Sequence, residues 1–371
     1  IARERLLDPN ARGGPGDLLR TRWPIWRLLT SIQAELAMGR AARPQLAKAH
    51  VPSILPSASL PADDSELYLS VIVQARNDDY GGNMMVRFNR MLLTATYMLH
   101  KLRIPSEIIV VDWNPPFGAG PLASLLERAP NTRSSVPIRV IRVPTGVHMS
   151  LPHHKAHPIF EHIAENVAFQ RARGRFVLKT NIDNIMSIDT AIFIARGQLR
   201  EDAVYRAAYA ELDFKPEADG LEAESLLEWV FSQPGLLRDM NLELVDLMAK
   251  YPEDTKVCTG GSQGGHSGDP VRPFYWAGSG DFVLTSRALV RHVHGYPQIA
   301  QNWQTDDLIH CRLRAVGARQ ILLQPPCVTV HQNHRRINRV RSSTRWVVTD
   351  SNFQDVCSSP FTLLPTQTGL G

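Results

Sequence analysis

The sequence predicts an α/β protein in which a mostly parallel sheet is flanked by helices. Apolar, β-branched runs such as "LYLSVIVQAR" and "SEIIVVDWN" have the composition of buried strands, and "MMVRFNRMLLTATYMLHKLR" between them has helical periodicity. Strands that are buried on both faces and alternate with helices form βαβ units. The carboxyl ends of such strands meet at one edge of the sheet, and ligands bind at that edge.

Four strands are expected in this sheet, near residues 69–75, 107–112, 138–143 and 175–180. The segment "FEHIAENVAFQRARG" predicts a helix before the fourth strand. Beyond Ser187 the pattern is looser. There "AVYRAAYAELDF" predicts a strand, "EAESLLEWVFSQPGLLRDMNLELVDLMAKY" a helix, and "DFVLTSRALVRHVHGYP" a strand followed by a helix. "TDDLIHCRLRAVG" predicts a helix that ends at Gly317 in the left-handed conformation, and strand residues follow in "RQILLQPPCVTVHQNH".

The composition divides the chain into three parts. Residues 1–66 are basic and contain several prolines, which indicates an arm or linker; residues 67–340 form the α/β domain, and residues 341–371 form a polar C-terminal tail. Because the chain begins with Ile1 and not with Met, we expect that an N-terminal segment was removed or left out. The location stays open between an organelle (Golgi lumen or mitochondrion) and the cytoplasm.

Charge and cysteine content exclude some classes of function. The formal net charge is +5, but the basic residues lack the interleaved aromatic residues of a nucleic-acid-binding surface. No apolar stretch approaches the ~20 residues of a membrane-spanning helix, so no membrane span is expected. The four cysteines have no CxxC spacing, which argues against a zinc site. Buried thiols in a reducing compartment are expected, with one disulfide as the alternative.

Polar side chains follow three of the predicted strands. They are Gln74, Arg76, Asn77 and Asp78 after the first strand, Asp112, Trp113 and Asn114 after the second, and Asn181, Asp183 and Asn184 after the fourth. In a parallel sheet these segments converge, and together they offer partners for the base, the ribose and the phosphates of a nucleotide. The alternative for any one of these residues is an ordinary role in a helix cap or a turn.

Three segments carry a family resemblance. "SVIVQARNDDYGGN", "EIIVVDWNPP" and "ENVAFQRARGRFVLKTNIDNIMS" resemble the nucleotide-sugar glycosyltransferases of the GT-A fold, and specifically a family-2-like branch with Ala-Arg-Asn-Asp, Asp-Trp-Asn-Pro-Pro and Thr-Asn-Ile-Asp motifs. The resemblance covers roughly residues 67 to 334. It implies a Rossmann-like GT-A sheet and a nucleotide site that includes Asn166 and Asn181 besides the residues after the first two strands.

The resemblance also implies a divalent cation, Mn²⁺ or Mg²⁺, bound together with a nucleotide-diphosphate sugar. Asp183 occupies the position of the carboxylate motif that holds this cation, and "VHQNH" resembles the terminal motif in which His331 and His334 complete the site. The usual motif has two aspartates, whereas here the first position is Asn181. This departure weakens the expected cation binding. A close histidine pair is also common on ordinary surfaces and in ordinary cores.

Two further segments resemble the acceptor side of these enzymes. Asp281 is implied to lie near the sugar, and Asp306 or Asp307 is implied to be the catalytic base of an inverting transferase. The alternative for the last two aspartates is that they cap the helix that follows them.

The leading hypothesis is a hexosyltransferase-type glycosyltransferase that acts on a nucleotide sugar and a hydroxyl acceptor, with inversion. The alternative is a catalytically inactive glycosyltransferase-like structural subunit of a larger, possibly organellar, assembly, which would contact protein partners through residues 1–66 and the C-terminal tail. The amide at Asn181 and the two long terminal segments motivate this alternative. A nucleotide-dependent oxidoreductase is disfavoured because no GxGxxG follows the first strand.

Overall fold

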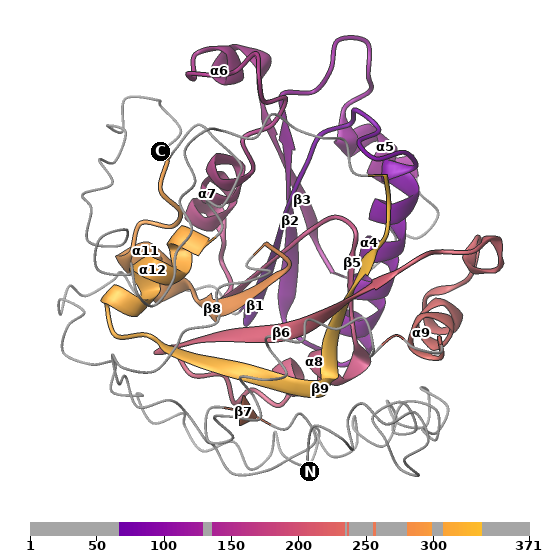
Figure 1. The fold of residues 1–371 in the computed structure, drawn as a ribbon, viewed down its shortest axis with the longest axis vertical. Coiled ribbons are helices and arrows are strands. Elements are labelled where there is room, and N and C mark those ends of the chain that lie inside the picture. Colours follow the sequence, from indigo (N-terminus) through magenta and orange to yellow (C-terminus); the bar gives the residue numbers. More distant parts are fainter. Residues whose placement is uncertain are drawn as a thin grey trace.

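The computed structural model describes residues 67–128, 136–233, 236, 255–256, 280–298 and 307–335 (Figure 1). The predicted arm (1–66) and the predicted tail (341–371) lie outside these residues, as do parts of the domain between them.

The described strands form one nine-stranded mixed sheet in the order β3-β2-β1-β4-β8-β6-β9-β5, with β7 also paired to β9. Their bounds are Leu69–Ala75 (β1), Ser106–Trp113 (β2), Ile138–Val143 (β3), Phe176–Thr180 (β4), Asn184–Met186 (β5), Ala203–Leu212 (β6), Thr255–Lys256 (β7), Phe282–Ser286 (β8) and Arg319–Gln332 (β9). Five of the eight pairings are parallel, so the predicted mostly parallel sheet is confirmed.

The first four strands of this order are parallel and in close register. Val71 of β1 lies opposite Ile108 of β2 on one side and opposite Leu178 of β4 on the other. β8 runs antiparallel to β4 and β6, and the short β5 runs antiparallel to the end of β9. The pairing of β5 with β9 places the end of β9 close to the carboxyl end of β4.

Helices cover both faces of the sheet (Figure 1). They are α4 (Met84–Lys101), α5 (Leu122–Arg128), α6 (Thr145–Met149), α7 (Glu161–Arg171), α8 (Ile188–Ala195), α9 (Ala223–Phe231), α11 (Arg287–His292) and α12 (Asp307–Ala315), with a 3₁₀ turn at Pro216–Ala218. Alternate strand residues face opposite layers: Val71 packs in the core with α4, α8 and α9, whereas Ile72 packs in the core with α7, α11 and α12. The two layers bury both faces, as the continuous apolar runs predicted.

The predicted strands agree with the observed ones to within one or two residues, whereas α7 ends three residues and α11 five residues before the ends of the segments predicted for them. Gly317 has a φ of 77° and follows α12, which confirms its predicted role as a left-handed helix end. The helix predicted from Glu222 onward is described as α9 up to Phe231, and most of the remainder lies outside the described residues.

The prediction of buried thiols is wrong for two cysteines. Cys311 on α12 and Cys327 on β9 are both disulfide-bonded, and both are buried. Cys258 and Cys357 lie outside the described residues. Among the described helices, none has the length and apolar character needed to cross a bilayer.

Gly174, just before β4, is fixed by close backbone contact. A Cβ at this position would lie 2.3 Å from the Ser70 backbone nitrogen and 2.5 Å from the Leu69 carbonyl carbon. Gly174→Ala should therefore lower the free energy of unfolding by at least about 1–3 kcal/mol, because backbone of β1 would have to move. Gly120→Ala is the matched control, since nothing lies within 4 Å of its added Cβ. Equal stability of the two variants in denaturant titration would contradict this packing.

Candidate functional site

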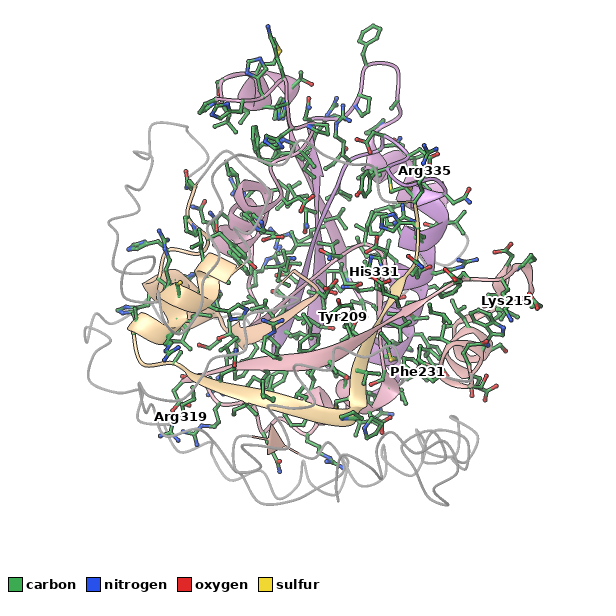
Figure 2. All side chains as sticks on the ribbon, in the orientation of Figure 1. Tyr209, Lys215, Phe231, Arg319, His331 and Arg335 are labelled. Carbon is green, nitrogen blue, oxygen red and sulfur yellow. The ribbon has the colours of Figure 1, made fainter. Side chains whose placement is uncertain are left out.

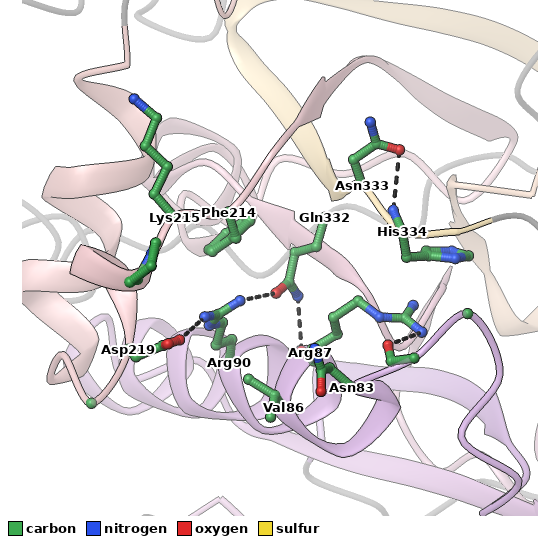
Figure 3. A pocket seen from close by; sticks show the side chains of 14 residues that line it. Asn83, Val86, Arg87, Arg90, Phe214, Lys215, Asp219, Gln332, Asn333 and His334 are labelled. Atoms are coloured by element: carbon green, nitrogen blue, oxygen red, sulfur yellow. Dashed lines mark hydrogen bonds and ion pairs between the residues drawn. The ribbon is translucent and has the colours of Figure 1, made fainter.

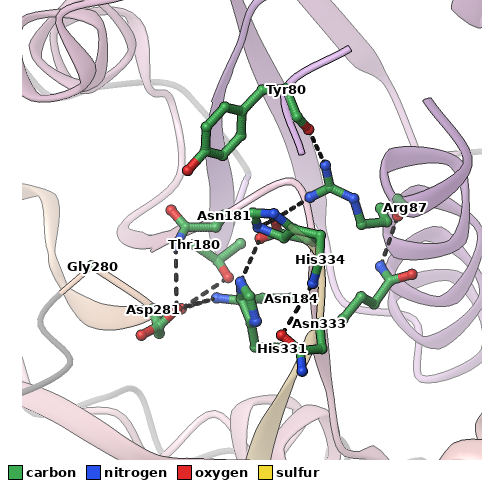
Figure 4. Close-up of polar contacts among 12 residues, drawn as sticks. Tyr80, Arg87, Thr180, Asn181, Asn184, Gly280, Asp281, His331, Asn333 and His334 are labelled. Atoms are coloured by element: carbon green, nitrogen blue, oxygen red, sulfur yellow. Dashed lines mark hydrogen bonds and ion pairs between the residues drawn. The ribbon is translucent and has the colours of Figure 1, made fainter. Parts of the chain in front are cut away.

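Asp183 lies at the carboxyl edge of the sheet, in the turn between β4 and β5, and two histidines meet it there. His331 is labelled in Figure 2, and both His331 and His334 are labelled in Figure 4. The pairing of Asn184 with His331 brings the end of β9 to this turn. His331 Nε2 is 3.7 Å from one carboxylate oxygen of Asp183, and His334 Nε2 is 3.2 Å from the other. One potential ligand atom from each of the three residues lies within 4.8 Å of the other two. The structure thus brings together the three residues predicted to bind the cation.

Arg87 of α4 is a fourth member of this cluster that the sequence did not reveal. Its Nη1 donates to Asp183 Oδ2 at 2.6 Å, and both side chains are buried. Its Nη2 donates to the backbone carbonyls of Tyr80 and Gly82. Arg87 therefore connects the turn after β4 with the loop after β1.

The charges around Asp183 decide its protonation state. Burial alone would raise the pKa of this carboxyl group, but the hydrogen bond from His334 and the charges of His331 and Arg87 outweigh burial and lower its pKa. Asp183 is therefore an ionised carboxylate at neutral pH, although it is almost fully buried.

The hydrogen bonds of His334 decide how its Nε2 can meet Asp183. The Nδ1–H of His334 donates to the carbonyl of Arg335 at 3.2 Å, which leaves Nε2 without a hydrogen in the neutral ring. A bare Nε2 lone pair would then face a carboxylate oxygen at 3.2 Å. Nε2 can therefore meet this carboxylate in two ways, as an N–H donor or as a ligand of a cation that it shares with Asp183.

The spacing and the donor types fit a divalent metal ion. Two ligand atoms at about 2.0–2.2 Å from one ion lie about 3.0–3.5 Å apart. The observed distances of 3.2 and 3.7 Å are close to this range but end at different oxygens of Asp183, and one ligand atom from each residue lies within 4.8 Å of the others, so small movements would bring all three onto one ion. Two features limit the fit. Arg87 places a positive charge on the same carboxylate, and His331 Nδ1 is buried with no partner among the described residues to fix its tautomer.

Amides form a second group beside the cluster (Figure 4). Asn181 Nδ2 and Asn184 Nδ2 both donate to Asp281 Oδ1, at 3.2 and 3.1 Å. Asn181 Oδ1 accepts from Gln74 Nε2 at 3.5 Å and from Lys179 Nζ at 3.3 Å. The structure therefore places Gln74, Asn181 and Asp281, three predicted site residues from distant segments, in direct contact. Gln74 Oε1 is buried and has no donor among the described residues.

A buried ionic chain lies beneath these amides. Lys179 Nζ is 3.2 Å from Glu165 Oε1, and Glu165 Oε2 is 3.1 Å from His162 Nδ1. Burial alone would raise the pKa of Glu165, but the charges of Lys179 and His162 and their hydrogen bonds outweigh burial and lower its pKa. Lys179 also donates to the Gly280 carbonyl. This chain of contacts connects α7, the end of β4 next to Asn181, and the backbone at Gly280.

The predicted residues at the ends of β1 and β2 contact each other's loops and the helix start that follows β2. Arg76 Nη1 pairs with Asp78 at 2.5 Å, and Arg76 Nε donates to the Asn114 carbonyl at 2.8 Å. Asn77 Nδ2 donates to the Gly120 carbonyl at 3.1 Å. Asp112 Oδ2 accepts from the Leu122 backbone N–H, at the start of α5, and burial raises the pKa of this carboxyl group. These contacts are those of turns and helix starts, which the alternative interpretation anticipated.

Two predicted nucleotide-binding residues lie in the interior. Trp113 is fully buried, and its Nε1 donates to His148 Nδ1 at 3.0 Å. Asn166 on α7 holds the backbone of Tyr296, donating to its carbonyl and accepting from its N–H, both at 2.8 Å. Their side-chain polar groups therefore have protein partners in this structure.

The predicted catalytic base cannot be placed in the same way. Asp306 lies outside the described residues, and Asp307 is described only as the first backbone position of α12.

The comparisons with known proteins give the following picture. No family model and no curated protein sequence matches this chain. Among solved structures, the mannosyltransferase PcManGT from Pyrobaculum calidifontis, in complex with GDP-Man and Mn²⁺, has a TM-score of 0.42 and 16% identity, over 85% of this chain and 70% of that one. S. aureus TarS 1–349 in complex with UDP-GlcNAc has a TM-score of 0.40 and 14% identity, over 78% of this chain and 64% of that one. At these scores the likeness indicates nothing about the chemistry of the site.

A double-mutant cycle should detect the buried pair of Arg87 and Asp183. Arg87→Met leaves a buried carboxylate without its strongest donor and should lower the free energy of unfolding by about 3–5 kcal/mol. The double variant Arg87→Met/Asp183→Asn should be less destabilised than the sum of its two single variants, because no unpaired charge remains. Asp219→Ala, at an exposed ion pair, is the control and should resemble the parent protein. Strict additivity in denaturant titrations would contradict the coupling.

The lowered pKa of Glu165 predicts a pH dependence of stability. A carboxyl group whose folded-state pKa is lowered stabilises the fold above its unfolded-state value, near 4.5, and loses this contribution as the pH falls through its folded-state pKa. The difference in free energy of unfolding between the parent and Glu165→Gln should therefore shrink as the pH is lowered from 6 toward about 3. A difference that stays constant over this range would show that Glu165 is not ionised in the folded state.

Proposed function

We propose that this chain is a GT-A-type glycosyltransferase, which moves a sugar from a nucleotide-diphosphate donor to a hydroxyl acceptor. The observation that carries the proposal is the convergence of Asp183, His331 and His334 at the carboxyl edge of the sheet, with His334 Nε2 facing an ionised carboxylate. An oxygen and two imidazole nitrogens, held together by segments from distant parts of the chain, form a donor set for a divalent cation beside the strand ends where nucleotides bind.

Asp183, His331 and His334 would hold this cation, and Arg87 would orient the carboxylate by retaining its hydrogen bond to Oδ2. A divalent cation at this position offsets the negative charge that develops on the departing diphosphate. Two imidazole ligands favour Mn²⁺ over Mg²⁺, because Mg²⁺ prefers oxygen ligands in a strict octahedron.

The donor's nucleoside would contact residues after β1 and β2. Gln74 Oε1 lacks a donor among the described residues, and a hydroxyl or N–H group of the ligand would supply one. Arg76, beside Asp78 and partly exposed, offers a cation next to the same edge. Asn181 and Asp281 would then line the side of the sugar, held by the chain of Lys179 and Glu165 beneath them.

The proposed transfer is a single displacement with inversion. The acceptor oxygen forms a bond to the anomeric carbon while the bond from that carbon to the diphosphate oxygen breaks, and the electron pair leaves with the nucleoside diphosphate. The proton of the acceptor hydroxyl passes to a carboxylate, for which Asp306 and Asp307 remain the predicted candidates.

Release of nucleoside diphosphate from UDP- and GDP-sugars tests this proposal. The purified parent chain should release nucleoside diphosphate with Mn²⁺ and lose this activity with a chelator. Asp183→Asn should reduce the rate at least about 100-fold, since even supporting contacts of metal ligands change activity 10- to 100-fold. His331→Ala should reduce it in the same direction.

Asp202→Asn is the matched control, because Asp202 pairs with Arg200 and Arg319 at the other end of β6 and β9. It should retain the parent rate, and thermal unfolding should show that all variants are folded. Turnover that is unaffected by the chelator and by Asp183→Asn would refute the cation-assisted mechanism. A chain that binds Mn²⁺ through Asp183 but turns over no donor would refute the enzyme and match a catalytically inactive structural subunit.

A further inference from the structure

A pocket of about 570 Å³ lies on the outer side of the Asp183 cluster, between α4 and the segment after β6 (Figure 3). Its walls come from residues 81–90, 214–220 and 332–334, so that Arg87 and His334 belong both to this pocket and to the cluster. The predicted nucleotide-binding residues at the ends of β1 and β2 are not among the residues that line it. The pocket therefore shares one wall with the cluster, and its lining differs from the predicted nucleotide site.

Three cations and one carboxylate are among the described residues that line the pocket, and two of the cations are already paired, Arg87 with Asp183 and Arg90 with Asp219. Arg87, Arg90 and Lys215 are cationic, and Asp219 is the one carboxylate among them. Arg87 and Arg90 are three residues apart on α4, so their side chains leave the same face of the helix. Lys215 stands on the opposite wall and is exposed.

The guanidinium of Arg90 is held in place before any ligand arrives. It lies 4.4 Å from the centre of the Phe214 ring, pairs with Asp219, and donates to Gln332 Oε1 at 3.5 Å. Gln332 in turn donates to the backbone carbonyl of Arg87 at 2.8 Å. A fixed guanidinium binds a planar or tetrahedral anion with little further loss of side-chain freedom.

Two further features of this region bear on how it would meet an anion. Arg87 Nε is a donor with no acceptor among the described residues, and water does not reach it readily because the residue is only 4% exposed. The N-terminus of α4, an 18-residue helix, borders the pocket and has no acidic residue in its first turn. The N–H of Met84, its first residue, donates to Asp79 Oδ1 at 3.0 Å, so this carboxylate offsets part of the positive end of the helix dipole and the remainder adds to the charge of the pocket.

We propose that this pocket binds an anionic small molecule through a phosphate or carboxylate group, at a site separate from that of the donor's diphosphate. Arg90 and Lys215 would bind the anion from two sides, and the N-terminal turn of α4 would lie beneath it. Asp219, at the rim, opposes binding of an anion. The inference does not depend on the proposed transferase activity, because its measurement is binding.

Calorimetric titration with inorganic pyrophosphate in metal-free buffer tests the site on the full chain. The parent should bind pyrophosphate saturably. Lys215→Gln and Arg90→Gln should each raise the Kd about three- to tenfold, since each removes a charged partner. Asp219→Asn should lower the Kd, because it removes the one carboxylate among the described lining residues.

Lys155→Gln makes the same charge change at an exposed lysine that does not line the pocket, and it should leave the Kd unchanged.

A second titration, in saturating nucleoside diphosphate, separates the two sources of an anion. A retained Kd for pyrophosphate supports a separate site, whereas full displacement of pyrophosphate overturns the proposal and assigns the pocket to the donor. Absence of saturable binding, or equal effects of Lys215→Gln and Lys155→Gln, also overturns the proposal. Because Lys215 is exposed, its variant reports on binding even if Arg90→Gln unfolds.

Discussion

The arrangement of the candidate site depends on one buried ion pair, between Arg87 and Asp183. Removing two charged groups from water is unfavourable, and it is tolerated here because each group has further partners. Arg87 also donates to two backbone carbonyls of the loop after β1, and the carbonyl of Asp183 accepts from the Gln332 N–H at 2.9 Å. The pair therefore fixes three segments relative to one another: the loop after β1, the turn after β4 and the end of β9.

A second buried pair supports the same edge from below. Lys179 lies in β4, points away from water, and is neutralised by Glu165 of α7. Its remaining donors go to Asn181 and to the carbonyl of Gly280, which precedes β8. The two ion pairs thus hold the ends of β4, β8 and β9 together from opposite layers of helices. Rigid placement of this kind is what a site needs if its groups are to act without reorganisation.

The sequence was informative where one segment alone determines the structure. The four parallel strands were predictable because burial on both faces leaves uninterrupted apolar runs, and Gly317 because few other residues favour a left-handed helix end. The short strands β5 and β7, of three and two residues, were not predicted, because no periodicity can develop over so few positions. The antiparallel direction of β8 also depends on tertiary structure alone.

The candidate site was predictable in part, through family resemblance. Asp183, His331 and His334 were assigned together on motifs, and the structure brings them together through the pairing of β5 with β9. Arg87 was missed, although a signal was present: it lies three residues after Met84 and directly before Phe88, on the apolar face of a predicted helix. Lys179, inside a buried strand, gave the same kind of signal. A charged residue at a core position indicates a buried partner, but the sequence does not say which one.

The structure gives a physical reason for an amide at Asn181, the position at which the motif that this segment resembles has its first aspartate. Asn181 Oδ1 accepts from Lys179 and Gln74, while its Nδ2 donates to Asp281. A carboxylate could accept from Lys179 but could not donate to Asp281, and it would face that second carboxylate at hydrogen-bonding distance. Only an amide meets both requirements. The negative charge of the cluster is therefore left to Asp183, whose carboxylate Arg87 already contacts, and the imidazole nitrogens of His331 and His334 are the other side-chain ligands that this cluster offers a cation.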